Sequence, residues 1–150
     1  MPIETKILAL AVSLFFMTTA QAQTSGASEA APSPSLKSTG HLLELRTYYA
    51  MPGKLEDLHK RFRDHTMRIF AKHGMTVAGF WGPVYKKDGS DSKLTYLLSF
   101  KNREERDAKW KEFVTDPEWQ KVSKESEANG KLVEKVESVF LYDTDYAPAK

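Results

Sequence analysis

Residues 42–49 constrain the fold of this chain more than any other stretch. They read LLELRTYY and lie between Gly40 and Pro52. An aliphatic and aromatic run bounded by turn residues predicts a β-strand, whose side chains alternate between two faces. One face carries Leu43, Leu45, Thr47 and Tyr49, and the other carries Leu42, Glu44, Arg46 and Tyr48. We expect the first face to pack in a core and the second, more polar face to line a wet cavity or an interface.

The later elements follow in an order that indicates a fold class. Apolar periodicity and turn residues predict a helix over 54–72, a strand over 75–81, a hairpin tip at 87–92 and a strand over 94–100. Asn102 and Asp116 are expected to cap two further helices, and a last strand spans 132–142. This order, β-α-β-β-α-α-β, predicts an α+β, ferredoxin-like sheet with helices on one face.

The face of the sheet without helices should be covered by a second copy of the chain. Both alternating sets of strand residues carry large apolar or aromatic side chains. Because a soluble protein does not leave such a patch in water, we expect a homodimer whose two sheets face each other as a dimeric α/β barrel.

Two local features of these elements are relevant to a site. On the second strand, Met75, Val77, Gly79 and Trp81 are expected on one side, and Thr76, Ala78 and Phe80 on the other. Gly79 lacks a side chain, which often marks a close approach by a backbone, an aromatic ring or a ligand.

On the first helix, one stripe at steps of three and four comprises Leu55, Leu58, Phe62, His65 and Ile69. His65 on this stripe is either a core histidine with a satisfied ring or a ligand-facing acid, base or donor.

The first 40 residues are expected to lie outside the folded domain. An uninterrupted apolar run at 7–17 follows Lys6 and precedes a small-residue cleavage pattern ending at Ala22. This pattern predicts a secretory signal peptide over 1–22, too short to span a bilayer comfortably; the alternative is an N-terminal membrane anchor. Residues 23–40 then predict a flexible linker, and residues 41–147 the domain. We therefore expect a periplasmic or secreted protein without stable membrane insertion after signal removal.

Composition excludes several classes of function. Lys and Arg number 22 against 20 Asp and Glu, and they are mixed along the chain, so no nucleic-acid partner is expected. The chain has no cysteine, which excludes disulfides and thiol catalysis. It also lacks a phosphate-binding glycine loop, an HExxH motif and a nucleophile elbow, and its histidine spacings do not form a helical metal site. No cofactor and no metal are expected.

A series of segments resembles the NIPSNAP family. They are ELRTY at 44–48, PGKL at 52–55, HG at 73–74, GFW at 79–81, DPEWQ at 116–120, VESVFL at 136–141 and TDY at 144–146. No single segment is specific, but together they occur in order over nearly all of residues 41–147. The resemblance implies the dimeric α/β-barrel fold and assigns no reaction.

Two functional hypotheses from different classes remain. The first is a module that binds a small hydrophobic or aromatic ligand in a dimer-supported pocket, with Phe62, Trp81 and Tyr96 as ligand-binding candidates. The second is a cofactor-independent oxygenase or isomerase, which needs a desolvated pocket, a base and oxyanion donors. His65 would be its base, and Arg46 and Tyr48 its donors.

Each of these candidates also has a structural interpretation. Arg46 can pair with Glu44 on the same face, Tyr48 can be an interface aromatic, and Phe62 and Trp81 can be core residues. A third hypothesis, haem bound through His59 or His65, rests only on the presence of these histidines. A pocket that connects Arg46, Tyr48 and His65 would favour the enzyme.

Overall fold

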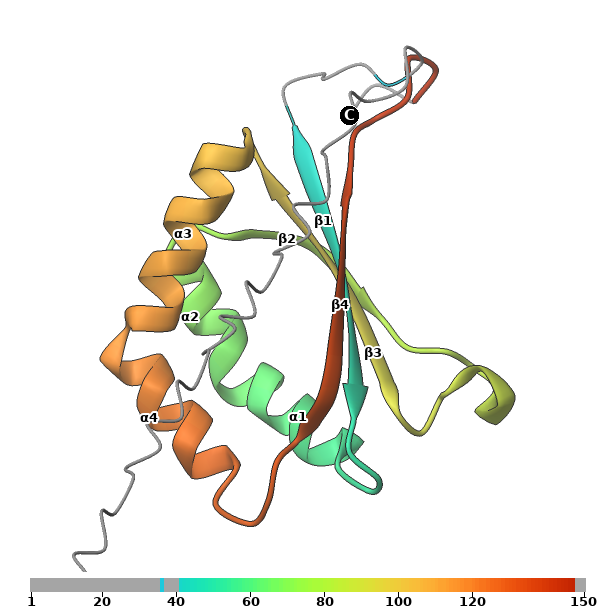
Figure 1. Cartoon of the computed structure of the whole chain (residues 1–150), viewed down its shortest axis with the longest axis vertical. Coiled ribbons are helices and arrows are strands. Elements are labelled where there is room, and N and C mark those ends of the chain that lie inside the picture. Colours follow the sequence, from blue (N-terminus) through green and yellow to red (C-terminus); the bar gives the residue numbers. More distant parts are fainter. Residues whose placement is uncertain (1–35, 37–40, 148–150) are drawn as a thin grey trace, which may run out of the picture. The chain divides into compact units, whose positions relative to one another are not determined.

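The computed structural model describes Leu36 and residues 41–147. The predicted signal peptide and all of the predicted linker except Leu36 lie outside the described residues, and Leu36 forms an isolated bridge with Thr144. The elements, in order, are β1 (Leu42–Ala50), α1 (Leu55–Arg61), the π-helical turn η1 (Phe62–Thr66), α2 (Met67–Lys72), β2 (Thr76–Trp81), the short 3-10 helix η2 (Lys86–Asp88), β3 (Lys93–Phe100), α3 (Arg103–Thr115), α4 (Pro117–Ser126) and β4 (Val133–Leu141) (Figure 1). Within this described part, every helix is too short or too polar to serve as a membrane-spanning segment.

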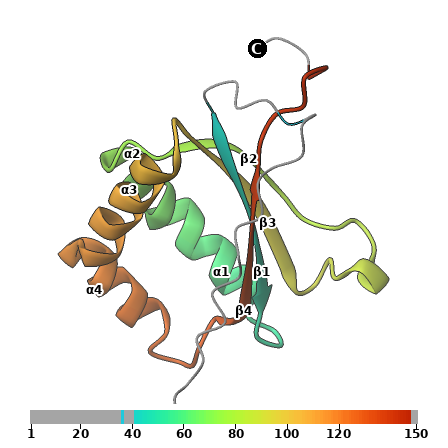
Figure 2. The same ribbon diagram turned by 45° about the horizontal axis from the view of Figure 1, so that its top comes forward.

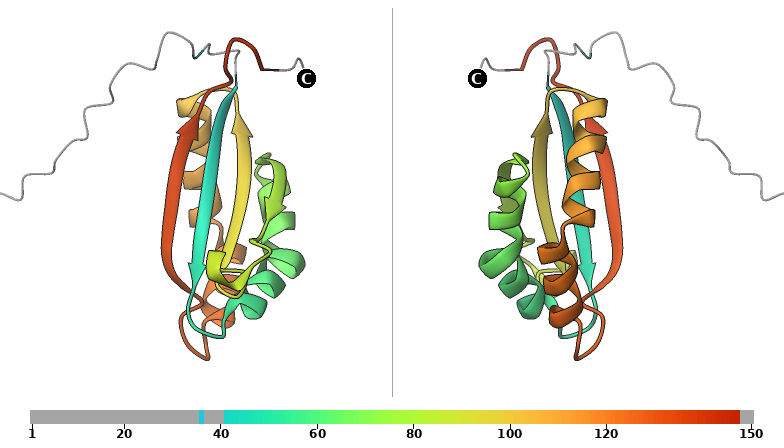
Figure 3. Two further views of the ribbon diagram at one scale, coloured as in Figure 1. Left: turned by 90° about the vertical axis from the view of Figure 1, so that its right-hand side faces the viewer. Right: turned by 90° about the vertical axis from the view of Figure 1, so that its left-hand side faces the viewer.

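The four strands form one antiparallel sheet with the order β2-β3-β1-β4. All of the long helices lie on one side of this sheet, and on the other side the only helical piece of the described residues is the short η2 in the β2–β3 connection (Figures 1 and 3). This is the predicted ferredoxin-like α+β arrangement, and that prediction is confirmed. Figure 2 shows the same two layers from a tilted direction.

Local sequence determines the ends of the helices as expected. Asn102 accepts a hydrogen bond from the backbone of Glu105 at 2.9 Å, and Asp116 accepts one from the backbone of Glu118 at 2.8 Å. These side chains satisfy N–H groups that a helix N-terminus leaves unpaired. Gly74 ends α2 with a φ of +63°, a left-handed conformation that glycine adopts without steric cost.

The predicted assignment of the two faces of β1 is wrong. The more polar set, with Glu44, Arg46 and Tyr48, faces the helices: Glu44 bonds Arg106 of α3, and the Tyr48 ring meets Phe62 of η1. Leu43, Leu45, Thr47 and Tyr49 lie on the face that the long helices leave uncovered, which we call the open face. The helix-facing polar groups can be buried because they satisfy one another, an outcome that alternation along one strand cannot reveal.

A β-bulge also changes the predicted faces of β2. The pairing with β3 skips one residue between Val77 and Gly79. Phe80 therefore lies opposite Tyr96 on the helix side, together with Val77, whereas the prediction separated Phe80 from Val77. The close approach predicted at Gly79 is confirmed, because a Cβ there would lie 2.8 Å from the Trp81 ring.

The helix predicted over 54–72 forms, but a π-turn changes which residue it buries. Over Phe62–Thr66 the turn is wider than an α-turn, so Thr66 rather than His65 faces the sheet. Thr66 is 1% exposed and donates to the carbonyl of Arg61 at 3.2 Å, whereas His65 is exposed. The prediction that His65 lies on the apolar face is therefore wrong.

Candidate functional site

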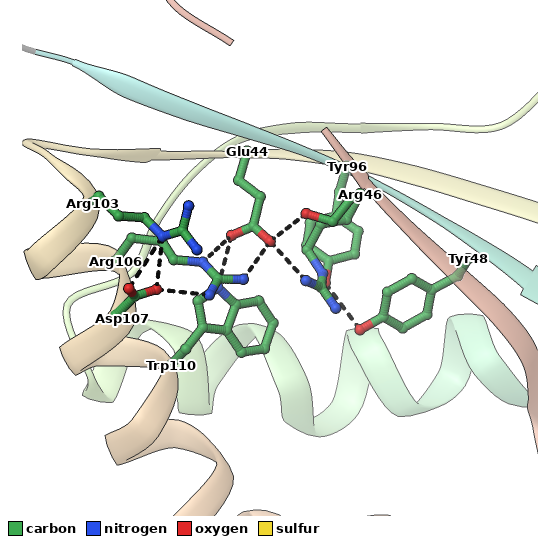
Figure 4. A network of polar contacts seen from close by, with 9 residues as sticks. Glu44, Arg46, Tyr48, Tyr96, Arg103, Arg106, Asp107 and Trp110 are labelled. Atoms are coloured by element: carbon green, nitrogen blue, oxygen red, sulfur yellow. Dashed lines mark hydrogen bonds and ion pairs between the residues drawn. The ribbon is translucent and has the colours of Figure 1, made fainter. Parts of the chain in front are cut away.

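A polar network lies between β1 and α3, with the carboxylate of Glu44 at its centre (Figure 4). Glu44 is fully buried. One of its oxygens accepts hydrogen bonds from Arg46 Nη1, Arg106 Nη2 and Ser138 Oγ, each at 2.7 Å. The other accepts from Arg106 Nε at 2.7 Å and Trp110 Nε1 at 2.9 Å. Five donors therefore converge on one carboxylate.

The network keeps its central carboxylate ionised. Burial by itself would raise the pKa of Glu44, but hydrogen bonds from Arg106, Ser138 and Arg46 outweigh burial and lower this pKa to about 2. The two guanidinium groups neutralise the buried negative charge, which would otherwise be very costly. Arg46 also stacks on the Trp110 ring at 4.3 Å, and Arg106 lies 5.3 Å from the Phe140 ring.

Two tyrosines extend this network toward α1. Arg46 Nε donates to the Tyr96 hydroxyl at 3.0 Å, and that hydroxyl donates to Tyr48 at 3.1 Å. Tyr96 has no exposed surface, and its burial raises the pKa of the phenol well above the usual range. The structure thus brings three of the predicted site residues, Arg46, Tyr48 and Tyr96, into one chain of hydrogen bonds.

A separate hollow lies at the β2 edge of the sheet, and we call it the apolar pocket. Its volume is about 270 Å³. Its lining comprises His59, Phe62, Arg63, Met67, Phe80, Trp81, Gly82 and Leu94. Phe62 and Trp81, two of the predicted ligand-binding residues, therefore share one pocket. Tyr96, the third, is not part of the lining. Its ring packs against the Phe62 ring, with the two ring centres 5.3 Å apart.

The remaining candidates line other hollows. His65 lines a polar hollow of about 320 Å³ between α1 and α4. Tyr48 lines a hollow of about 290 Å³ between α4 and β4. None of these three pockets contains Arg46, and none joins Tyr48 with His65. The geometry that would favour the enzyme, a pocket connecting all three residues, is not found among them.

Sequence reasoning missed three partners of Glu44. Arg106 and Trp110 come from α3, and Ser138 comes from β4, 94 residues away in the chain. The sequence did contain a signal for Arg106. It lies four residues before Trp110, so both share the helix face expected to be buried, and a buried arginine requires an acidic partner. Ser138 carried no such signal. Among the described residues, no group of three or more His, Cys, Asp or Glu side chains could hold a metal ion.

The comparisons with known proteins agree with this architecture. The family model NIPSNAP matches residues 43–148. An uncharacterized NIPSNAP domain protein from Burkholderia xenovorans is 24% identical with a TM-score of 0.61, covering 72% of this chain and 99% of that one. A NIPSNAP family protein from Agrobacterium tumefaciens is 21% identical with a TM-score of 0.63, covering 73% and 99%. No curated protein matches the chain.

Proposed function

Since the chain belongs to the NIPSNAP family, whose matching solved structures include uncharacterized proteins, we propose that it is a small-molecule binding module. It acts after signal removal as a periplasmic or secreted protein. Its ligand is a small hydrophobic or aromatic molecule held in the apolar pocket, and its partner is a second copy of the same chain.

The lining of the apolar pocket is the observation that carries this proposal. Aromatic and aliphatic side chains dominate it, and two of them remain accessible: Met67 is 39% exposed and Trp81 is 53% exposed. The volume of about 270 Å³ lies just below the usual range for ligand pockets, which suits a ligand of one or two rings. The π-turn that forms one wall supports a binding role, because such turns occur often at functional sites.

The open face supports the proposed homodimer. Its apolar side chains include Leu45, Leu97, Val139, Leu141 and Trp81. Val139 is 51% exposed and Leu141 is 38% exposed, although both lie beside other aliphatic residues across the sheet. A two-fold contact between two such faces would remove this apolar surface from water. Trp81 belongs to both the open face and the apolar pocket, so a second copy would also support the pocket.

The contacts of the polar network favour binding over catalysis. Arg46 already pairs with Glu44 through Nη1 and donates to Tyr96 through Nε, so these two donors are used within the network. His65 lines a different hollow from Tyr48. An oxygenase or isomerase on this chain would therefore need another arrangement of base and donors than the predicted one.

The test uses the protein exported with its own signal and purified in mature form. Native mass spectrometry should detect a co-purifying small apolar molecule, and ligand-observed NMR with indole as the probe should show saturable binding. Met67→Gln should weaken indole binding severalfold, because it places an amide in the apolar wall. Val114→Gln is the matched control, since Val114 is 48% exposed on α3 and outside the pocket.

Two results would overturn the proposal. One is an equal effect of the two substitutions on indole binding. The other is a wild-type protein that neither retains an apolar molecule nor binds indole.

A further inference from the structure

The hollow between α4 and β4 that Tyr48 lines has a different chemistry from the apolar pocket, and we call it the Arg61 cleft. Its volume is about 290 Å³. Its lining comprises Tyr48, Arg61, Trp119, Ser123, Glu127, Lys131, Val133, Glu134, Lys135 and Val136. We propose that this cleft binds a small organic monocarboxylate with an aromatic or otherwise apolar body.

The state of Arg61 is the main observation. Its side chain is only 6% exposed, yet its Nε has no hydrogen-bond partner within the described part of the chain. Its Nη1 makes two long contacts, 3.5 Å to Ser126 Oγ and 3.4 Å to a carboxylate oxygen of Glu127. A buried guanidinium usually makes short bidentate bonds to a carboxylate. Arg61 lines both this cleft and the polar hollow between α1 and α4, and its guanidinium retains capacity to bind a better-placed carboxylate.

The remaining walls suit a flat apolar body. The Trp119 ring lies 5.5 Å from the Arg61 guanidinium, and Tyr48 closes the cleft from β1. Val133 and Val136 line it from β4, and Val136 is 41% exposed. Trp119 and Tyr48 can contact an aromatic ring in offset or edge-on geometry.

The charges of the lining select one carboxylate rather than a multiply charged anion. Glu127 and Glu134 line the cleft together with Arg61, Lys131 and Lys135, so the charges of the lining sum to +1 and match a singly charged anion better than a phosphate-like group. Glu127 is 35% exposed, so it can turn toward solvent when a ligand takes its place beside Arg61. Lys131, at the same cleft, adds a positive charge that would attract the ligand.

The Arg61 cleft is a different site from the apolar pocket, although both approach the same aromatic pair. Phe62 lines the apolar pocket and Tyr48 lines the Arg61 cleft, and their rings meet edge-on at 5.7 Å. Residues specific to each hollow, such as Met67 and Trp119, therefore report on the two sites separately.

The experiment compares benzoate with the neutral isostere benzamide on the mature wild-type protein, by calorimetry and by NMR shift mapping. Benzoate should bind at least tenfold more tightly, with shifts centred on Trp119, Val133 and Val136. Glu127→Gln should tighten benzoate binding about threefold to tenfold, because it removes the competing charge and keeps an acceptor oxygen. The matched control Glu104→Gln, an exposed residue of α3, should leave the affinity unchanged.

Arg61→Gln should abolish the preference for benzoate over benzamide. If Arg61→Gln prevents folding because Arg61 is buried, the benzoate affinity of Glu127→Gln tests the proposal instead. Equal affinities for benzoate and benzamide would overturn the proposal. So would weaker benzoate binding by Glu127→Gln, or shifts centred on Met67 and Phe80. None of these outcomes depends on whether indole binds the apolar pocket.

Discussion

The substitution Glu44→Gln tests the central role of the polar network. One carboxylate oxygen accepts three hydrogen bonds and the other accepts two, so an amide in either orientation places an NH₂ group against at least two donors. Two guanidinium groups also lose their buried counter-charge. Removing one partner of a buried ion pair costs about 3–5 kcal/mol, a large part of the roughly 5–15 kcal/mol that stabilises a domain.

The pH dependence gives a second route to the same magnitude. The pKa of Glu44 falls from 4.5 to about 2 on folding, and a difference of this size corresponds to about 3 kcal/mol. Because the folded-state pKa is lowered, this stability is fully present above pH 4.5 and is lost as the pH falls toward 2. The stability difference between wild type and Glu44→Gln should therefore shrink over that window.

The assay is urea unfolding followed by circular dichroism at several pH values between 2 and 7. Glu125→Gln is the matched control, because Glu125 pairs with Lys121 at 3.9 Å on the exposed side of α4, away from the sheet, and it should change stability little. A Glu44→Gln protein within about 1 kcal/mol of wild type at neutral pH, the range typical of exposed ion pairs, would refute the argument. A difference that stays constant from pH 7 to pH 2 would also refute it.

Three further predictions concern the sheet and a helix end. Gly79→Ala should displace the Trp81 ring, which lies 2.8 Å from the new Cβ position, and shift tryptophan fluorescence; an unchanged spectrum would contradict the placement of that ring. Val139→Glu should convert the proposed dimer to a monomer, as measured by light scattering. Val84→Glu, at an 83% exposed position outside the sheet, should leave the dimer intact. A wild-type protein that is already monomeric would contradict the proposed dimer. Asn102→Ala should destabilise the protein by about 1 kcal/mol through loss of the cap on α3, measured by thermal unfolding.

Local sequence determined most of the secondary structure. The caps at Asn102 and Asp116, the helix end at Gly74 and the alternating strands were all identified from the chain, because each depends on residues a few positions apart. Their order was sufficient to predict the ferredoxin-like fold. The family resemblance, carried by seven short segments, agrees with the match to the NIPSNAP model.

The tertiary structure alone decided which side chains meet. Alternation along β1 defines two sets of residues, but the buried set is the one that α3 covers, and Glu44 can be buried only because Arg106 and Ser138 arrive from distant segments. The bulge in β2 and the π-turn of the first helix each shift the pattern by one residue relative to the regular period. As a result, Phe80 lies on the helix side together with Val77, and His65 is exposed to solvent. Such shifts are favoured by packing against other elements, so the hydrophobic periodicity of a single segment cannot predict them.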